Sequence, residues 1–303
     1  MTNSGRGGAP AESFRQAIRR PIFVVSSPRA GSTLLFDTLI QAPGLCSTGG
    51  ESHGLIEGIR ALHPQANGWE SNRLTARDAR PEVLEELSRR FLATLRDRDG
   101  SAAGPALRMI EKTPKNSLRI PFLDFAWPDS TFVYLYRDAR ETMASMIEAW
   151  LSGGFRTYPR LPGWTGLPWS LLLVPGWREL NGLPLPEIVA RQWAATTAAL
   201  LDDLERLPQE RVRVVSFGAF LVSPQEVVSG LCESLDLEWD RTLGPLLPVA
   251  HTAVSTPRAD KWRAREAEIE AVWPLVRETD ERARDFCAGR AGVGPGAGAG
   301  GGA

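Results

Sequence analysis

The segment IFVVSSPRAGST at residues 22–33 constrains the fold most strongly. Residues 22–26 form a nearly continuous apolar run, which is typical of a strand buried on both faces of a sheet. A helix is predicted from about Gly31, with Leu35 and Leu39 on one of its faces. A buried strand that turns sharply into a helix indicates an α/β protein with helices packed on a mainly parallel sheet.

The same alternation continues along the chain. β-branched and aromatic residues predict further strands at 107–110, 131–136 and 212–217. A 3.6-residue apolar period predicts helices at 81–96, 139–150, 188–207, 224–235 and 264–286, the last of them broken at Pro274. A short helix is expected at 116–125, and Asp138 is the expected N-cap of the helix at 139.

The charge balance and the cysteine content indicate which ligands and binding partners are not expected. The 303 residues include 35 Lys plus Arg and 36 Asp plus Glu. The positive and negative charges therefore nearly balance, and no long-range electrostatic attraction to nucleic acid or to an anionic membrane is expected. Three widely separated cysteines, Cys46, Cys232 and Cys287, suggest neither a disulfide framework nor a zinc site. We therefore expect a soluble, cytoplasmic protein whose affinity for anions is local.

The predicted domain spans residues 18–287. Residues 1–17 and 288–303 are poor in large apolar side chains and are predicted to be disordered tails. Residues 151–186 break the periodic pattern with many Trp, Pro and Gly residues, which is typical of a functional lid. We expect Phe155, Trp164, Trp169 and Trp177 in this insertion either to line an apolar acceptor pocket or simply to pack the loop down.

The turn after the first strand predicts an anion site. A strand that enters a helix at Gly31 presents backbone N–H groups and the positive end of the helix dipole. Arg29 adds a permanent positive charge, and Ser32 and Thr33 add hydroxyl donors. The pattern is not the nucleoside triphosphate loop GxxxxGK[ST], because it has no Lys. The predicted anion-binding residues are Ser27, Pro28, Arg29, Ala30, Gly31, Ser32 and Thr33.

A second anion site is predicted where the strand at 131–136 leaves the sheet. Arg137 follows that strand directly, at the carboxyl edge where ligands bind in open α/β folds. Ser145 falls roughly opposite the apolar stripe of the next helix, so its hydroxyl can face a ligand. An Arg and a Ser that converge in this way suit a second phosphate group.

Together the two segments SSPRAGSTLL and FVYLYRDARETMASM resemble the sulfotransferase family that uses 3′-phosphoadenosine 5′-phosphosulfate (PAPS). The resemblance is nearest to bacterial enzymes that act on small molecules and natural products in secondary metabolism. It implies a three-layer P-loop-like fold, a 5′-phosphosulfate on the first loop and a 3′-phosphate on Arg137 and Ser145. The segments EKTPKN at 111–116 and PRADKWR at 257–263 extend it, the latter implying that Arg258, Lys261, Trp262 and Arg263 close over the nucleotide.

Three departures from the family pattern stand out. Ala139 replaces a Pro, which is mild because Ala also starts a helix well. Arg29 stands where many members have Lys, and a guanidinium can stabilise charge but cannot donate a proton. Phe217 and Gly218 also replace a Tyr-Glu pair.

The resemblance implies in-line sulfuryl transfer from PAPS to a hydroxyl or amine of a small acceptor, leaving adenosine 3′,5′-bisphosphate (PAP). We assign Arg29 and Lys112 to the developing charge, and no metal is needed because cations and N–H groups can hold it. Glu51 is the favoured general base, with His53 close behind and His251 third. Their spacing places Glu51 and His53 on one face if the chain there is extended.

Two other interpretations stay open at this point. A P-loop kinase would need a Mg²⁺ carboxylate after a buried strand, which is not evident. A non-catalytic nucleotide-binding protein would tolerate changes at Glu51, His53 and Lys112. The acceptor's identity and the oligomeric state are not encoded in any motif.

Overall fold

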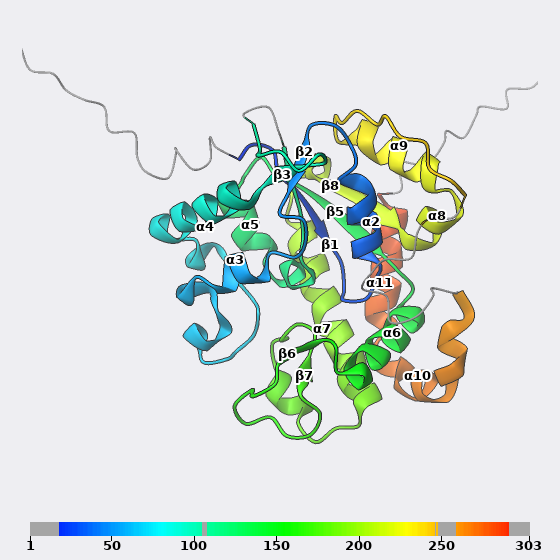
Figure 1. Ribbon diagram of the computed structural model, residues 1–303. Coiled ribbons are helices and arrows are strands. Elements are labelled where there is room, and N and C mark those ends of the chain that lie inside the picture. Colours follow the sequence, from blue (N-terminus) through cyan, green and yellow to red (C-terminus); the bar gives the residue numbers. More distant parts are fainter. Residues whose placement is uncertain (1–17, 105–107, 246, 248–258, 291–303) are drawn as a thin grey trace, which may run out of the picture.

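A six-stranded sheet forms the centre of the computed structural model, which describes residues 18–104, 108–245, 247 and 259–290 (Figure 1). Its strand order is β3-β2-β4-β1-β5-β8. The neighbouring strands are parallel except for the pair β2 and β3, which is antiparallel. The strands of this sheet are β1 Ile22–Val25, β2 Leu45–Ser47, β3 Arg96–Asp97, β4 Arg108–Lys112, β5 Thr131–Tyr136 and β8 Val212–Ser216.

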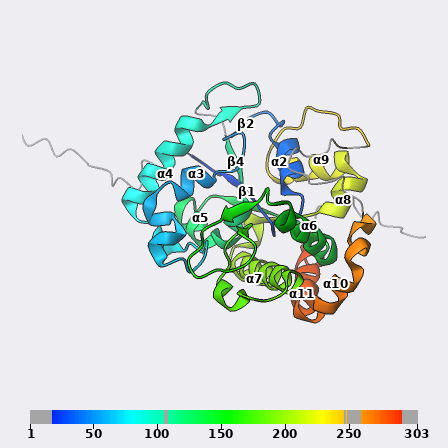
Figure 2. The ribbon, with the colours of Figure 1, turned by 60° about the horizontal axis from the view of Figure 1, so that its bottom comes forward.

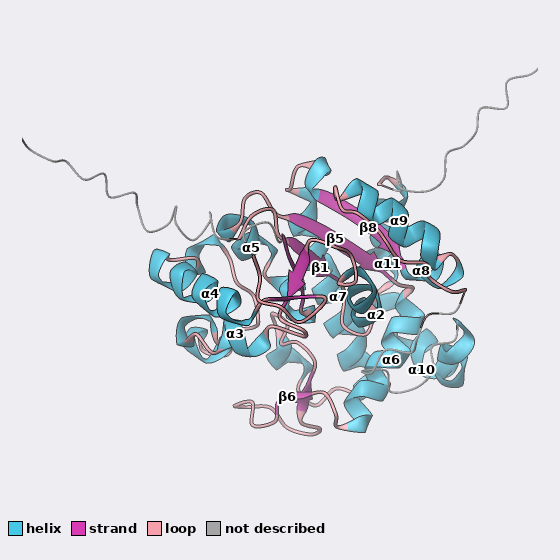
Figure 3. Ribbon diagram, turned by 45° about the horizontal axis from the view of Figure 1, so that its top comes forward, coloured by secondary structure: helices cyan, strands magenta, loops and turns pink. Residues whose placement is uncertain are grey.

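Helices cover both faces of this sheet, so the three-layer α/β prediction is confirmed (Figures 2 and 3). One face packs against α2, α8 and α9, and the other against α4, α5, α7 and α11. The α-helices are α2 Ser32–Leu39, α3 His53–Glu57, α4 Pro81–Thr94, α5 Ile120–Ala126, α6 Ala139–Ser152, α7 Leu185–Glu205, α8 Phe217–Val222, α9 Pro224–Ser234, α10 Glu266–Val272 and α11 Arg277–Ala288. The 3₁₀ helices are η1 Arg60–Leu62, η2 Pro64–Asn67, η3 Ala76–Asp78, η4 Pro114–Leu118, η5 Trp177–Leu180, η6 Gln209–Arg211, η7 Ala259–Arg265 and η8 Trp273–Leu275.

Strand β1 lies inside the sheet because its four side chains are apolar and are needed on both faces. Phe23 and Val25 enter the core under α4, α5 and α7, whereas Ile22 and Val24 enter the core under α2, α8 and α9. Strand β1 pairs with β4 on one side and β5 on the other, in parallel. The carboxyl ends of these three strands therefore meet at one edge of the sheet.

The insertion at residues 151–186 packs its apolar side chains into a core that it shares with α6, α7 and α10. It contains a two-stranded antiparallel ribbon, β6 Arg156–Tyr158 and β7 Trp169–Ser170, which lies beside α6 and α7 at the bottom of Figure 1. Trp169 and Trp177 are fully buried there against the apolar side of α6. The prediction that these two rings line an acceptor pocket is wrong, and the packing alternative describes them.

Three local predictions also need correction. The helix expected at 116–125 is divided into η4 and α5 at Arg119, because Pro121 lies in the first turn of α5 and starts a new helix there. Glu51 and His53 do not lie on one extended strand, since α3 begins at His53. The short strands β2 and β3 have too few residues to show a period and were not predicted individually.

Other expectations at the helix ends are met. Asp138 caps α6 by accepting bonds from the N–H groups of Arg140 and Glu141. The last helical region is interrupted at η8, which contains Pro274. None of the helices in the described ranges is both long and apolar enough to cross a membrane.

Candidate active site

The loop between β1 and α2 takes the conformation expected of an anion site. Arg29 and Gly31 have positive φ angles of 67° and 98°, so the chain turns sharply into the first residue of α2, Ser32. Within the described residues, no acceptor bonds to the backbone N–H groups of Ser32 and Thr33. Those N–H groups and the helix dipole are available to an anion. Ser27, Pro28 and Ala30 are buried and shape the turn.

Gly31 has a steric role that the sequence did not reveal. A Cβ atom built on Gly31 would lie 2.2 Å from Cε2 of Phe217, the first residue of α8. The ring of Phe217 therefore occupies the side of Gly31 that a Cβ atom would fill. The same ring lies 4.9 Å from the guanidinium carbon of Arg137. Phe217 thus packs between the two predicted anion sites.

Arg29 links the predicted sites. Its Nε donates to Oγ of Ser145 on α6 at 3.4 Å, and its backbone carbonyl accepts a bond of 3.1 Å from Arg137. Its guanidinium carbon lies 4.5 Å from the centre of the Phe155 ring. Burial, and next the neighbouring positive charge of Arg137, lower the pKa of Arg29. Two cations held this close are suited to an anionic ligand with more than one charged group.

Arg137 is oriented by its own helix. It leaves the end of β5, and its Nε donates to Glu141 one turn later on α6 at 3.0 Å. Its side chain is only 11% exposed. Arg137 and Ser145 therefore lie beside the loop between β1 and α2, which we call the donor loop.

Lys112 is buried at the end of β4 and is not a solvated surface lysine. Its Nζ donates to Oγ1 of Thr33 at 3.0 Å and to Oε1 of Glu51 at 2.8 Å. The other oxygen of Glu51 lies 2.5 Å from Nε2 of His53. A continuous polar chain therefore runs from the first turn of α2 through Lys112 and Glu51 to His53.

This chain of contacts controls the charge of Glu51. Burial opposes ionisation of its carboxyl group, but the bond to His53 and the charge of Lys112 outweigh burial and lower the pKa of Glu51 to about 2. Its side chain is 30% exposed. Glu51 is thus an ionised, reachable carboxylate beside the donor loop.

A buried network that the sequence analysis missed supports these residues. Oγ of Ser52 donates to Glu111 at 2.6 Å, and the backbone N–H of Ser52 donates to Oγ1 of Thr113 at 2.8 Å. Asn116 also donates to Glu111. Burial raises the pKa of the Glu111 carboxyl group. Glu111 lies next to Lys112 in the EKTPKN segment, and this was the only feature of the sequence that pointed to a role for Glu111 in the site.

A second buried network ties the insertion to the sheet. Nζ of Lys115 donates to both oxygens of Glu57 at 2.8 Å and to the Tyr158 hydroxyl at 2.9 Å. Arg119 also bonds to Glu57, at 2.5 Å. Burial lowers the pKa of Lys115 to about 8. These residues fix β6 against η4, immediately after the strand that carries Lys112.

The late basic segment lies beside α6. Nζ of Lys261 donates to Glu148 at 2.7 Å. Trp262 packs near the guanidinium groups of Arg140 and Arg263, at 5.6 and 5.0 Å. Arg258 and His251 lie outside the described residues, so their predicted roles stay predictions.

Of the four aromatic residues predicted to line the acceptor pocket, Phe155 reaches the donor loop through Arg29. Trp164 is partly buried and packs against Trp169 and Trp177 with ring centres 4.8 and 6.2 Å apart. His63 caps η2 and packs on Trp69.

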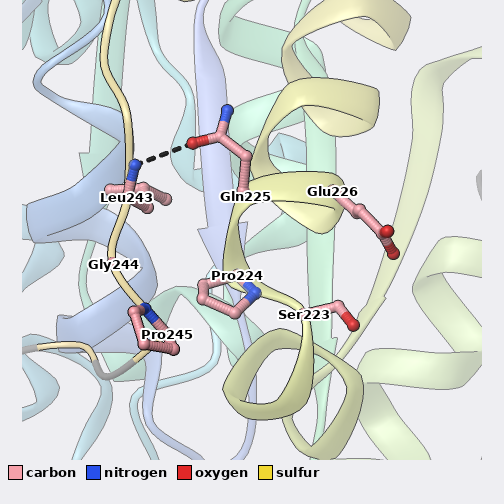
Figure 4. Close-up of a pocket in the computed structure, with 7 residues that line it drawn as sticks. All are labelled: Ser223, Pro224, Gln225, Glu226, Leu243, Gly244 and Pro245. Atoms are coloured by element: carbon pink, nitrogen blue, oxygen red, sulfur yellow. Dashed lines mark hydrogen bonds between the residues drawn. The ribbon is translucent and has the colours of Figure 1, made fainter.

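A small surface pocket of about 170 Å³ lies apart from these residues, between the start of α9 and residues 243–245 (Figure 4). Gln225 accepts a bond from the Leu243 backbone N–H there, and none of the predicted site residues lines the pocket. Among the described residues, no group of three His, Cys, Asp or Glu side chains could hold a metal ion.

The fold and these contacts define an α/β protein with a cluster of cationic side chains, Arg29, Lys112 and Arg137, at the carboxyl edge of its parallel sheet. Residues 21–166 match the family model described as "Sulfotransferase family". This part of the chain includes the donor loop, Glu51, His53, Lys112, Arg137 and Ser145.

Several proteins named as sulfotransferases are similar to this chain. A Caenorhabditis briggsae protein named as a protein-tyrosine sulfotransferase is 32% identical over 127 residues, which are 42% of this chain and 42% of the relative. The solved sulfotransferase domain from the curacin biosynthetic pathway is 18% identical, with a TM-score of 0.43 and coverage of 86% of this chain and 98% of that one. A sulfotransferase structure from Mycobacterium tuberculosis H37Rv is 14% identical, with a TM-score of 0.48 and coverage of 88% and 80%.

Proposed function

We propose that this protein transfers a sulfuryl group from PAPS to a hydroxyl or amine of a small, hydrophobic acceptor and releases PAP. The observation that carries the proposal is the convergence of the α2 N-terminus with Arg29, Lys112 and Arg137. This convergence falls within the residues that match the sulfotransferase family. Such a site suits a nucleotide with separate phosphate and phosphosulfate groups.

The chain's own groups suit in-line transfer. The bond between sulfur and the bridging oxygen of the donor breaks, a bond from sulfur to the acceptor oxygen or nitrogen forms, and the acceptor proton leaves to a base. Arg29, Lys112 and the N–H groups of α2 are arranged to stabilise negative charge on the sulfuryl and bridging oxygens. Arg137 and Ser145 would hold the distal 3′-phosphate, with Lys261, Trp262 and Arg263 near the nucleotide.

Glu51 is our choice of base. It is ionised and partly exposed, and it contacts Lys112, which would hold the leaving phosphate. The acceptor would therefore lie between Glu51 and the donor loop, with Phe155 as the nearby apolar surface. A phenolic acceptor fits these neighbours, and the C. briggsae relative is named for tyrosine, also a phenol.

The test is calorimetric titration of PAP into wild type and Arg137→Ala, with ATP plus Mg²⁺ as a control ligand. We expect PAP to bind tightly to wild type, ATP to bind poorly, and the variant to lose at least tenfold in affinity. Arg89→Ala, which removes an exposed Arg on α4, is the matched control and should bind as wild type does.

Two outcomes contradict the proposal. A preference for ATP with Mg²⁺ favours the P-loop kinase. A non-catalytic nucleotide-binding protein is favoured if PAP binds but no sulfuryl group is transferred from PAPS to phenols, amines or a tyrosine peptide. In that case PAP affinity should also be unchanged by substitutions at Glu51 and Lys112.

A further inference from the structure

Glu51 is held at both ends of its carboxylate. Lys112 donates to Oε1 at 2.8 Å, and His53 contacts Oε2 at 2.5 Å. If the proposed function is right, the Lys112 ammonium also has to serve the sulfuryl donor, because it already contacts Thr33 in the first turn of α2. When Lys112 turns toward the donor, His53 is the remaining anchor of Glu51 in this set of contacts.

His53 is itself held firmly. It is the first residue of α3 and follows Ser52, whose backbone N–H and hydroxyl bond to Thr113 and Glu111. Thr113 directly follows β4, the strand that ends with Lys112. The chain segment that carries Glu51 and His53 is therefore bonded, through Ser52, to residues on either side of Lys112 at the end of β4.

The two ring nitrogens of His53 have different surroundings. Nε2 faces Glu51, whereas Nδ1 is buried without a hydrogen-bond partner in the described structure. The tautomer with hydrogen on Nε2 donates to the carboxylate and leaves only a lone pair unpaired at Nδ1. A proton added at Nδ1 would be a buried N–H without an acceptor, which is costly. This geometry suits a hydrogen-bond donor better than a proton acceptor.

We propose that His53 is a positioning residue, whose Nε2–H aims Glu51 at the acceptor while Lys112 stabilises the transferring group. This assignment rests on the proposed function. It gives different roles to Glu51, the base, and His53, the positioning residue, which the sequence analysis treated as alternative bases. The charged groups around the ring are Glu51 before it, Glu57 on α3, and Glu111 and Lys112 on β4.

The test compares His53→Gln, which keeps a side-chain N–H but cannot act as a base, with His53→Phe, which keeps a ring but no donor. Glu51→Gln is the reference for loss of the base. Transfer from PAPS is measured at about pH 8 with phenol, which is neutral there, and with 4-nitrophenol, which is largely ionised there and needs no base. PAP affinity and thermal unfolding are measured for every variant.

With phenol, we expect Glu51→Gln to lower kcat by about 10²–10⁴, His53→Phe by about tenfold, and His53→Gln by less than threefold. With 4-nitrophenol the losses should largely disappear, and PAP affinity should stay unchanged. If His53→Gln is as inactive as Glu51→Gln, then His53 is the base and the proposal is overturned. If His53→Phe matches wild type with phenol, His53 positions nothing.

A second measurement does not depend on the acceptor. Carboxyl ¹³C NMR, with the Glu51 signal assigned from Glu51→Gln, reports the titration of Glu51 with and without PAP. Removal of the donor in His53→Phe should raise the pKa of Glu51, because the bond from His53 helps to lower it, and His53→Gln should restore the wild-type value. An unchanged pKa in His53→Phe overturns the proposal. Failure of wild type to bind PAP instead refutes the proposed function, and the ligand-free titration still tests the contact.

Discussion

Replacement of Gly31 by Ala should destabilise the protein through two separable effects. The φ angle of Gly31 is 98°, which L-residues with a Cβ rarely adopt, and adopting a left-handed conformation costs about 1–2 kcal/mol. The new methyl group would also lie 2.2 Å from the ring of Phe217. That ring is 3% exposed, so it has no open space into which to move.

The magnitude follows from adding the two effects. Overpacking in a well-packed core costs about 1–3 kcal/mol. Together with the backbone cost, Gly31→Ala should lower the free energy of unfolding by about 2–5 kcal/mol. The displaced loop should also weaken PAP binding, because the N–H groups of α2 depend on its geometry.

Urea unfolding of four proteins separates the effects. In a Phe217→Leu background, the additional cost of Gly31→Ala should fall toward about 1–2 kcal/mol, because only the backbone term remains. Gly218→Ala is the matched control, since its Cβ would meet nothing closer than 3.8 Å and Ala suits helix α8. Equal stability of Gly31→Ala and wild type, or an equal cost in both backgrounds, would refute the steric explanation.

Three further predictions concern the site and the insertion. Ser145→Ala should weaken PAP binding by about 0.5–1.5 kcal/mol, or roughly two- to twelvefold in Kd. Ser152→Ala, at the exposed end of the same helix, is the control and should leave the Kd unchanged. Equal Kd values for both variants would show that Ser145 does not contact PAP. The pKa of Glu51 is about 2 in the folded protein and about 4.3 in an unfolded chain, so its ionised form contributes stability that is present above about pH 4.3 and is lost as the pH falls through about 2. The difference in unfolding free energy between wild type and Glu51→Gln should accordingly shrink over that window in urea titrations, and a difference that is constant with pH contradicts the assignment. Trp177→Ala should lower the unfolding free energy by about 3–5 kcal/mol, because the ring is fully buried, and a folded variant of unchanged stability would mean that Trp177 is not part of the core.

The fold class was predictable because its signals are local. The four apolar residues of β1 and the capping Asp138 of α6 act within a few positions of one another, so their periods and propensities show in the sequence. Strands β2 and β3 were harder, since three and two residues contain no period and are held in place by neighbouring strands.

The place of the candidate site residues in the fold was predictable in part for the same reason. Arg29, Arg137 and Lys112 each follow or end a strand, and parallel strands bring their carboxyl ends to one edge. The partners of these residues were not predictable. Glu111 and Phe217 have ordinary neighbours in the sequence, and they matter because tertiary packing places one under Ser52 and the other against Gly31.

The sequence by itself determined the alternation of strands and helices, the sharp turn after the first strand and the cations that follow the strands, because each depends on short-range covalent geometry and side-chain pattern. Only the tertiary structure decided that Trp169 and Trp177 belong to a core while Phe155 meets Arg29, and that Lys112 joins Thr33 to Glu51. Those outcomes depend on which surfaces meet between segments that are far apart in the sequence. The contacts of Arg29 with Ser145 and of Lys112 with Thr33, 116 and 79 residues apart, are set by the packing of whole helices on the sheet.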